Sequence, residues 1–340
     1  MIASPSYDLD KLRQCSAEIG ANRLLVQAAG GNTSIKENGV LWIKASGTCL
    51  ADALTNDIFV AVDLAAMAQD IQQQPAYADQ PQRYLIGKSI MRPSIETSLH
   101  AVFSQRVVLH VHCVNTIAFA VLVDAESKLS ERLRGFEWAF VPYAKPGAGL
   151  AQSVTRVLQP KTCVVVLGNH GLLVTGNTVE EAHARLLRVQ AALKPDVPVM
   201  VLEADTQQLV NIAGEHYEVM PAEDPIHQAG LSKARISHAT GGSLYPDHVT
   251  FCGVGAAVLK ACQVAGAERE LAELSVLVIV PEAGVLIRTG YSAANLALAR
   301  CLSDVVSRVP EQAELNYLTA AQNHELMYWE AETYRQKLNA

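Results

Sequence analysis

The sequence has 340 residues, of which 50% are hydrophobic and 18% are charged, and this composition excludes a disordered chain. The length exceeds what one hydrophobic core usually fills, so we expect a larger domain over residues 1–200 and a smaller one over residues 201–340. The formal net charge of −7, with no basic block to offset it, argues against a nucleic-acid partner.

The cysteines and the N-terminus indicate the cellular compartment. Seven cysteines are scattered without a CxxC pair, which predicts buried free thiols and a reducing cytoplasm. The first residues lack both a basic segment and an apolar core, so we expect no signal peptide. No apolar run reaches the length that spans a membrane, so we expect a cytoplasmic protein with no membrane partner.

The N-terminal segment is expected to form one long helix followed by strands. Hydrophobic residues at roughly helical spacing predict a helix over residues 8–29, which ends at Gly30-Gly31. Residues 32–36 and 40–44 form two predicted strands joined by a Glu-Asn-Gly turn, a strong hairpin pattern. Residues 59–63 are predicted to form another short strand.

Helices and strands alternate through the middle of the chain, which predicts an α/β or α+β core. Pro93, followed by Ser94 as the N-cap, predicts a helix over residues 94–104. The other elements expected here are strands at 107–111, 140–143, 163–167 and 172–174 and helices at 115–123, 149–158 and 177–193, the last of them capped by Asn177-Thr178 with Glu180 and Glu181.

The C-terminal third contains a faint repeat of the preceding part. Residues 275–300 show the order strand, glycine turn, strand and helix that residues 164–187 show first. The turn position of His170 in the first copy holds Ala283 in the second. The pattern is either an internal duplication or two similar αβ units. Beyond it, one or two helices are expected to start at Pro310.

Two histidines one residue apart lie at the end of the predicted strand at 107–111. Because side chains i and i+2 of a strand share one face, His110 and His112 are expected about 6–7 Å apart. His170 is flanked by asparagine and glycine at the end of another predicted strand. Three neutral imidazoles with an open position are typical of a catalytic zinc site. The alternative is that the fold supplies hydrogen-bond partners for histidines buried in the core.

A carboxylate precedes these histidines. Glu96 either belongs to the same site or is a helix-start carboxylate that interacts favourably with the helix dipole. His100, one helical turn later, is a further ligand, a residue of the helix surface, or a residue that lies next to the ligands without binding the metal. We interpret Glu96 and the three histidines as one metal site that polarises a carbonyl next to a breaking carbon–carbon bond.

A second group of residues is rich in small hydrogen-bond donors. The segment Gly30–Ser34 either only ends a helix or forms an anion-binding nest of N–H groups and hydroxyls. Ser46, Gly47 and Ser94 offer further donors of this kind. Such donors hold phosphate without a P-loop, and the sequence has no GxxxxGK[ST] motif. It has no GxGxxG motif after a strand either, so a nicotinamide cofactor has no support.

Six motifs occur in the order, and at roughly the spacing, of the class II aldolase/adducin family, which the chain resembles over about residues 8–200. They are Gly30-Gly-Asn-Thr-Ser34, Lys44-Ala-Ser-Gly47, Pro93-Ser-Ile-Glu96, His110-Val-His112, Val141-Pro-Tyr143 and Gly168-Asn-His-Gly171. The chain is more similar still to the aldolase part of the bifunctional rhamnulose-1-phosphate aldolase/dehydrogenases, because Tyr245–His248 and Pro310–Gln312 resemble the segment that follows it there. We expect no dehydrogenase domain in this sequence.

The resemblance implies an α/β/α sandwich with a mostly antiparallel central sheet, together with a smaller C-terminal α/β domain of unknown role. It also implies a homo-oligomer, either a tetramer or a dimer, with sites at the subunit interfaces. By the matching motifs, Zn²⁺ or another divalent metal is bound by His110, His112 and His170, while Glu96 binds the resting metal and then acts as acid/base. The phosphate pocket comprises Gly31, Asn32, Ser46, Gly47 and Ser94, and the proton donor from across the interface is Tyr143.

The implied function is that of a zinc-dependent aldolase that cleaves a ketose phosphate or related sugar by a retro-aldol step through an enediolate. Pentulose-phosphate 4-epimerases and sugar-acid decarboxylases use the same scaffold, and an adducin-like protein on it is non-catalytic. Glu96, where the epimerases tend to carry Asp, favours cleavage, and the three histidines argue against the non-catalytic alternative. Ile95 stands where a second pocket serine is common, and Lys145 adds a charge near Tyr143, so a carboxylate or a different sugar phosphate is an alternative anchoring group of the substrate.

Overall fold

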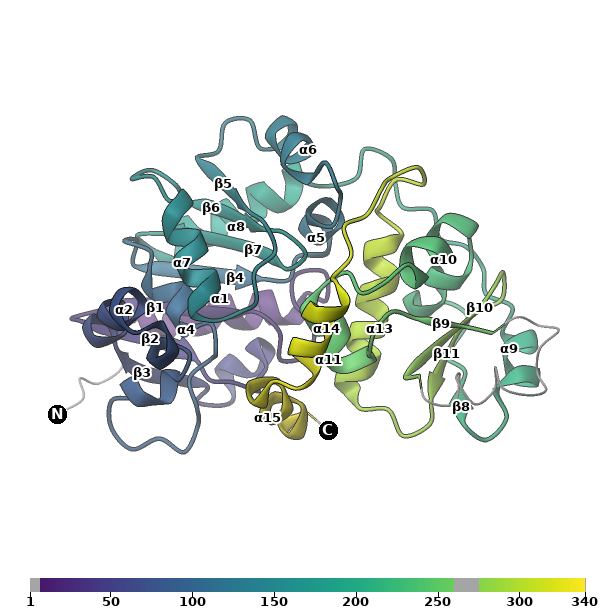
Figure 1. Ribbon diagram of the computed structural model, residues 1–340, viewed down its shortest axis with the longest axis horizontal. Coiled ribbons are helices and arrows are strands. Elements are labelled where there is room, and N and C mark those ends of the chain that lie inside the picture. The colour runs from purple at the N-terminus through teal and green to yellow at the C-terminus, as the bar shows by residue number, and fades with distance from the viewer. Residues whose placement is uncertain (1–6, 260–274, 340) are drawn as a thin grey trace. The chain divides into compact units, whose positions relative to one another are not determined.

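The computed structural model describes residues 7–259 and 275–339, and the chain divides into two compact units. The first unit lies within Met1–Thr116 and Glu126–Leu193, and the second within Ile117–Ala125 and Lys194–Ala340. Each unit has its own sheet (Figure 1).

The first unit is built on a seven-stranded sheet with the strand order β3-β2-β1-β4-β7-β6-β5. All neighbouring strands are antiparallel except β5 and β6, which run parallel. The mostly antiparallel sheet confirms the predicted fold class. The strands are β1 (Asn32–Glu37), β2 (Val40–Lys44), β3 (Phe59–Asp63), β4 (Val107–Val111), β5 (Trp138–Val141), β6 (Val164–Leu167) and β7 (Gly171–Gly176).

Helices pack on both faces of this sheet (Figure 1). One face packs against α4 and α7, whose Leu99, Leu150 and Val154 share a buried cluster with Val108 of β4. The other face is covered by α1 and α8. The helices of this unit are α1 (Tyr7–Ala21), η1 (Leu50–Leu54), α2 (Leu64–Gln73), α3 (Pro75–Ala78), η2 (Pro81–Tyr84), α4 (Thr97–Ala101), α6 (Ala125–Arg132), α7 (Ala148–Val157) and α8 (Val179–Ala192), and α5 (Val114–Ala120) leads from this unit into the second.

Local signals placed several elements correctly. The predicted hairpin between β1 and β2 is confirmed, and its turn residues Asn38 and Gly39 have φ angles of 50° and 80°, the left-handed region that Asn-Gly turns occupy. The predicted cap of α8 is also confirmed, since the Thr178 side chain accepts a hydrogen bond from the Glu181 backbone N–H.

Two helix boundaries expected from the sequence are wrong. The first helix ends at Ala21, not at Gly30, because the Asn22 side chain accepts a hydrogen bond from the Leu24 backbone N–H at 3.0 Å and turns the chain. The helix after Pro93 begins at Thr97, so Ser94 is not its N-cap. Ser94 instead accepts a hydrogen bond from the backbone N–H of Glu96, which holds the segment before α4 in a turn.

The second unit contains a four-stranded sheet in the order β8-β11-β10-β9. The short segment before Ala125 belongs to this unit because Val123 and residues 121–122 pair with residues 314–316. Pro310 starts no helix, in contrast to the expectation, and two separate helices follow it from Ala320 onward. The elements are α9 (Thr206–Ala213), β8 (Tyr217–Glu218), η3 (Pro225–Gly230), α10 (Lys233–Thr240), α11 (Pro246–Cys252), β9 (Ala257–Val258), β10 (Leu277–Val280), β11 (Gly284–Arg288), α13 (Ala293–Val306), α14 (Ala320–Met327) and α15 (Glu330–Leu338).

The faint sequence repeat corresponds to two similar hairpins. In β6–β7 the turn residue Asn169 has a φ of 52°, and in β10–β11 Glu282 has a φ of 67° at the same place. The next residue is His170 in the first hairpin and Ala283 in the second, as the sequence indicates. The second hairpin therefore has the same backbone turn without the imidazole.

Six of the seven cysteines lie in the described residues and are thiols that form no disulfide there, while Cys262 lies outside the described residues. Cys15, Cys113, Cys252 and Cys301 are buried, and Cys49 and Cys163 are partly exposed. In the part of the chain that the structure describes, no helix combines the length and apolar character needed to cross a membrane.

His248 of α11 predicts a pH-dependent stability of the second unit. The residue is fully buried, neither ring nitrogen has a hydrogen-bond partner among the described residues, and burial lowers its pKa to about 4. Between pH 6.5 and 4 the unfolded chain therefore binds more protons than the fold, so stability is complete above pH 6.5 and is lost as the pH falls toward 4. We expect His248→Leu to remove about 2–3 kcal/mol of the difference in unfolding free energy between pH 7 and pH 4.

Urea unfolding of the wild type and of His248→Leu, each at pH 7 and at pH 4, measures this effect. His216→Gln, at an exposed position of the same unit, provides the control for replacing a histidine as such. An unchanged pH dependence in His248→Leu would refute the prediction.

Candidate metal centre

Four buried side chains of the first unit converge on one point. They are Glu96, His110, His112 and His170, and one ligand atom from each lies within 4.8 Å of the others. The Nε2 atoms of His110 and His112 are 3.2 Å apart. The Oε1 atom of Glu96 lies 3.4 Å from Nε2 of His110 and 3.3 Å from Nε2 of His170.

Three neighbouring strands bring these residues together. In β4, His110 lies opposite Asn32 of β1 on one side and Leu173 of β7 on the other. His112 follows directly after β4, so it projects to the same side as His110, as the strand periodicity predicts. His170 occupies the turn between β6 and β7, and the antiparallel pairing of β7 with β4 brings this turn to the end of β4.

The orientation of His110 is set by the backbone. Its Nδ1 lies 3.1 Å from the carbonyl oxygen of Leu172, and a carbonyl can only accept, so Nδ1 carries the proton. In the tautomer that carries its proton on Nδ1 alone, the lone pair of Nε2 points toward the other three ligand atoms. A metal-binding histidine in proteins is commonly oriented by such a hydrogen bond to a carbonyl oxygen.

Glu96 is held by a residue distant in the sequence. The Asn32 side-chain amide donates to Oε2 of Glu96 at 2.8 Å and to Oγ of Ser94 at 3.2 Å. The other carboxylate oxygen, Oε1, faces the histidines and forms no hydrogen bond to any described residue. A buried carboxylate oxygen without a hydrogen bond is costly, and a cation at the centre of the cluster would remove that cost.

The electrostatics of the cluster favour the protonation states that bind metal. Burial raises the pKa of Glu96, but the neighbouring His110 and His170 outweigh burial and hold its pKa well below its usual value. Burial lowers the pKa of His170 to about 4, against a smaller opposing effect of Glu96. At neutral pH Glu96 is therefore a carboxylate and His170 is a neutral imidazole, which are the forms that ligate a cation.

The donor set fits a divalent metal ion. Three imidazole nitrogens and one carboxylate oxygen suit zinc and other first-row divalent ions. His100 is not one of the four residues, because its Nδ1 lies 2.7 Å from Oγ of Ser34. The side chain of His100 is buried, so a position on the helix surface is excluded as well, and the structure supports the remaining alternative, a residue next to the ligands that does not bind the metal.

The five residues expected to bind the substrate lie in three loops that the fold joins. Gly31 precedes β1 and Asn32 is its first residue, while Ser46 and Gly47 follow β2. The Ser46 backbone N–H donates to the carbonyl of Arg92, next to the segment that contains Ser94. Asn32 and Ser94 are hydrogen-bonded to each other, so these donors are adjacent to Glu96.

Sequence reasoning missed the contact between Asn32 and Glu96. The family resemblance implies only a substrate-binding role for Asn32, whereas its amide also positions the carboxylate. The pairing register, which places Asn32 opposite His110, is the tertiary fact that brings the amide to this cluster.

Tyr143 lies beyond the end of β5 and is half-buried. Its backbone runs beside Gly168, where a Cβ atom would come 3.0 Å from the Tyr143 nitrogen. The structure thus places Tyr143 beside the turn that carries His170. Its role as a proton donor across a subunit interface stays a prediction.

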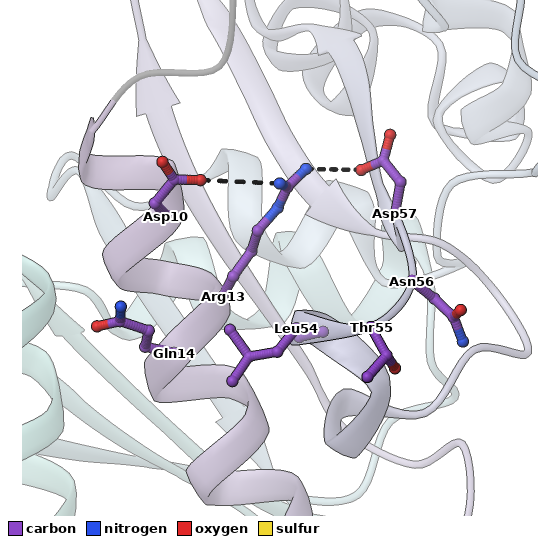
Figure 2. A pocket seen from close by; sticks show the side chains of 8 residues that line it. Asp10, Arg13, Gln14, Leu54, Thr55, Asn56 and Asp57 are labelled. Atoms are coloured by element: carbon purple, nitrogen blue, oxygen red, sulfur yellow. Dashed lines mark hydrogen bonds and ion pairs between the residues drawn. The ribbon is translucent and has the colours of Figure 1, made fainter.

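A separate pocket of about 690 Å³ lies between α1 and the segment that follows η1 (Figure 2). In it, Arg13 forms ion pairs with Asp57 at 2.7 Å and with Asp10 at 3.7 Å. The pocket contains none of the four clustered residues, and its one arginine is neutralised by two carboxylates. It is therefore distinct from the candidate metal centre.

Gly171 is predicted to be essential for the geometry of the cluster. A Cβ atom at this position would lie 2.5 Å from the carbonyl oxygen of Val111 and 3.3 Å from the His112 ring. We expect Gly171→Ala to separate β7 from β4, with a loss of about 1–3 kcal/mol in stability and about tenfold in metal affinity. Unfolding and metal titration measure the two effects. Gly149→Ala is the control, because nothing lies within 4 Å of its added Cβ, and equal behaviour of the two variants would contradict the prediction.

With this geometry in view, comparison with known proteins places the chain in a family. A model of the Class II Aldolase and Adducin N-terminal domain matches residues 10–195, so the chain belongs to the class II aldolase/adducin family. The predicted family is thereby confirmed.

Three relatives illustrate the range of this similarity. The structure of the N-terminal Class II Aldolase domain of a conserved protein from Thermoplasma acidophilum is 26% identical, with a TM-score of 0.50, and the match covers 57% of this chain and 95% of that one. The L-fuculose phosphate aldolase of Methanococcus maripaludis is 26% identical over 172 residues, which are 48% of this chain and 82% of that protein.

The third relative is the protein of Bacillus subtilis named uncharacterized oxidoreductase YuxG. It is 28% identical over 186 residues, or 50% of this chain. The match covers only 27% of the Bacillus protein, so this chain spans about a quarter of the length of that relative.

Proposed function

We propose that this protein is a zinc-dependent aldolase that cleaves a ketose phosphate or a related sugar by a retro-aldol reaction. The single observation that supports this proposal best is the convergence of Glu96, His110, His112 and His170, in which one carboxylate oxygen has no hydrogen bond among the described residues. The family of the chain and the name of the Methanococcus relative agree with this chemistry.

Each residue of the site has a role in this proposal. His110, His112 and His170 hold the metal ion, which when bound acts as a Lewis acid that polarises the substrate carbonyl and stabilises the negative charge formed next to it. Glu96 accepts and returns a proton at the reacting carbon or hydroxyl, as a general acid/base. Tyr143, from a neighbouring subunit, takes up the proton of the hydroxyl that becomes the aldehyde, and in the reverse, condensing direction it donates this proton to the aldehyde oxygen.

The substrate is anchored by the loops around β1 and β2. Gly31, Asn32, Ser46, Gly47 and Ser94 surround its anionic group, a phosphate or, in a sugar acid, a carboxylate. Asn32 additionally keeps the Glu96 carboxylate in place through its hydrogen bond. Anion binding by backbone N–H groups and hydroxyls positions the rest of the substrate at the metal.

The rest of the proposal concerns the whole protein. We expect residues 1–200 to act as the catalytic domain, and residues 201–340 to form a C-terminal domain whose role is separate from metal binding. The active form is a homo-oligomer, a tetramer or a dimer, in the cytoplasm, which is consistent with the reduced cysteines. No nucleic acid or membrane takes part.

A metal analysis followed by a substrate panel tests the proposal. The purified protein should contain about one zinc ion per chain and release an aldehyde from at least one ketose 1-phosphate. Formation of an epimer or of carbon dioxide instead would identify a 4-epimerase or a sugar-acid decarboxylase on the same scaffold. If the purified protein binds no metal even after zinc is added, only a non-catalytic, adducin-like function remains.

A further inference from the structure

Alternate residues of β1 hold the segment that contains Glu96. Asn32 and Ser34 are two residues apart in the strand, so their side chains project to the same face of the sheet. The Asn32 amide donates to Oε2 of Glu96 at 2.8 Å, and Oγ of Ser34 lies 2.7 Å from Nδ1 of His100. Two residues of a strand advance about 6.7 Å and four residues of a helix about 6 Å, so the spacings of the two hydrogen bonds match.

A third residue on this face continues the series beyond the end of α4. Lys36 donates from its Nζ to the backbone carbonyl oxygens of Phe103 and Gln105. We call the side chains of Asn32, Ser34 and Lys36 the β1 polar row. The row binds the residue before α4, the last turn of α4 and the segment after it, in the order in which the chain runs.

α4 depends on this support because it has only five residues, far fewer than an isolated helix needs to be stable. Apolar packing also holds it, since Leu99 shares a buried cluster with Val108. Apolar contacts are non-directional and allow a helix to shift, whereas a hydrogen bond restricts both distance and angle. The β1 polar row therefore fixes the place along the sheet at which Glu96 lies.

The bond between Ser34 and His100 is the part of the row that the proposed site does not yet explain. Both side chains are 0% exposed, and Nε2 of His100 has no hydrogen-bond partner among the described residues. Burying an imidazole that is hydrogen-bonded at one nitrogen only is costly. A role of the Ser34–His100 bond in the site would account for that cost.

We propose that His100 and Ser34 are positioning residues that hold the Glu96 carboxylate at the metal centre by fixing α4 on β1. This inference rests on the proposed function and deepens it, because it identifies what keeps the acid/base group in place. A shift of α4 along β1 would move Oε1 of Glu96 away from His110 and His170, from whose Nε2 atoms it now lies 3.4 and 3.3 Å.

A purely structural hydrogen bond is the competing explanation, and the opposite face of β1 offers a matched control. Thr33 lies between Asn32 and Ser34 in the strand, and its Oγ1 is 2.7 Å from Oγ of Ser16 in α1. Ser16 and Thr33 are also 0% exposed. Ser16→Ala therefore removes a buried bond of the same length from the same strand without changing the β1 polar row.

The visible absorption spectrum of the cobalt-loaded protein tests the position of Glu96 without any substrate, because the spectrum depends on the ligands of the metal and their geometry. We expect His100→Phe and Ser34→Ala to shift the spectrum toward that of Glu96→Gln, and Ser16→Ala to keep the wild-type spectrum. These three variants should lose similar stability in urea. His100→Asn keeps a hydrogen-bonding group near the position of Nδ1 and should restore the wild-type spectrum.

Three results would overturn the proposal. They are a wild-type spectrum in Ser34→Ala and in any His100→Phe protein that folds, an equal shift in Ser16→Ala, and a wild-type spectrum in Glu96→Gln. Ser34→Ala provides the reading by itself if His100→Phe does not fold.

A kinetic comparison separates this inference from the proposed function. For a ketose 1-phosphate, Ser34→Ala and His100→Phe should lower kcat about tenfold or more and change KM less than about twofold, because a misplaced acid/base group slows the reacting step. A shifted cobalt spectrum in a protein that cleaves no ketose would sustain the role of His100 and refute the aldolase function. Cleavage with a kcat and a cobalt spectrum that do not depend on His100 or Ser34 would refute their role and leave the aldolase function in place. A protein that binds no cobalt would refute both.

Discussion

His110→Ala is expected to abolish metal binding and nearly all activity. His110 is fully buried between β1 and β7, and its Nε2 lies within 3.4 Å of both Glu96 and His112. Removing one of three imidazoles leaves a divalent ion with too few ligands, and it leaves the Glu96 carboxylate facing an apolar gap. We expect less than about one zinc ion per ten chains after dialysis and a rate reduced by at least about 10³-fold.

Metal content measured by mass spectrometry, together with the rate of aldehyde release, checks this prediction. His183 of α8 supplies the control, because it is a partly exposed histidine in the same unit whose Nδ1 lies 3.8 Å from the Glu18 carboxylate. His183→Ala should keep both zinc and activity. A His110→Ala protein that retains its zinc would show that the cluster is not the metal site.

Glu96→Gln is expected to keep the metal but to lose activity by about 10²–10⁴-fold, the usual contribution of a positioned acid/base. In the wild type the Asn32 amide donates to Oε2 of Glu96 at 2.8 Å. The glutamine carbonyl can accept the same hydrogen bond, so the side chain should stay in place. What is lost is the ability to take up and return a proton. The three histidines remain and should hold zinc.

Steady-state rates and zinc content of the same preparations test this second prediction. Glu96→Asp keeps the charge on a shorter side chain, so its rate should exceed that of Glu96→Gln. A purely structural role of Glu96 does not predict this difference between the two variants. Turnover of Glu96→Gln close to that of the wild type would exclude the assigned acid/base role. Loss of zinc in this variant would instead make Glu96 a required ligand.

Much of the site followed from short-range patterns. The two-residue spacing of His110 and His112 on a strand put both imidazoles on one side, and the structure confirms it with Nε2 atoms 3.2 Å apart. His170 was recognised from its position at a strand end before a glycine. The close approach of Gly171 to the Val111 carbonyl explains why a glycine is needed there.

Other features depended on residues far apart in the chain. The first helix stops at Ala21 because a side-chain hydrogen bond of Asn22 outweighs a hydrophobic spacing that could have continued to residue 29. The residues after Pro93 stay in a turn up to Glu96 because Ser94 bonds locally and to Asn32. Residues 117–125 join the second unit through backbone pairing with residues 314–316, which no local pattern indicates.

By itself, the sequence determined the strands, the hairpin turn and the residue types that can bind a metal ion, because periodicity and turn chemistry act over a few neighbouring residues. Only the tertiary structure decided which of these groups meet. The register of β1, β4 and β7 brings Asn32 and the histidines together, and the hydrogen bond from Asn32 holds Glu96 beside them. Such contacts depend on strand pairing and on the desolvation of buried polar groups, and both are properties of the folded chain as a whole.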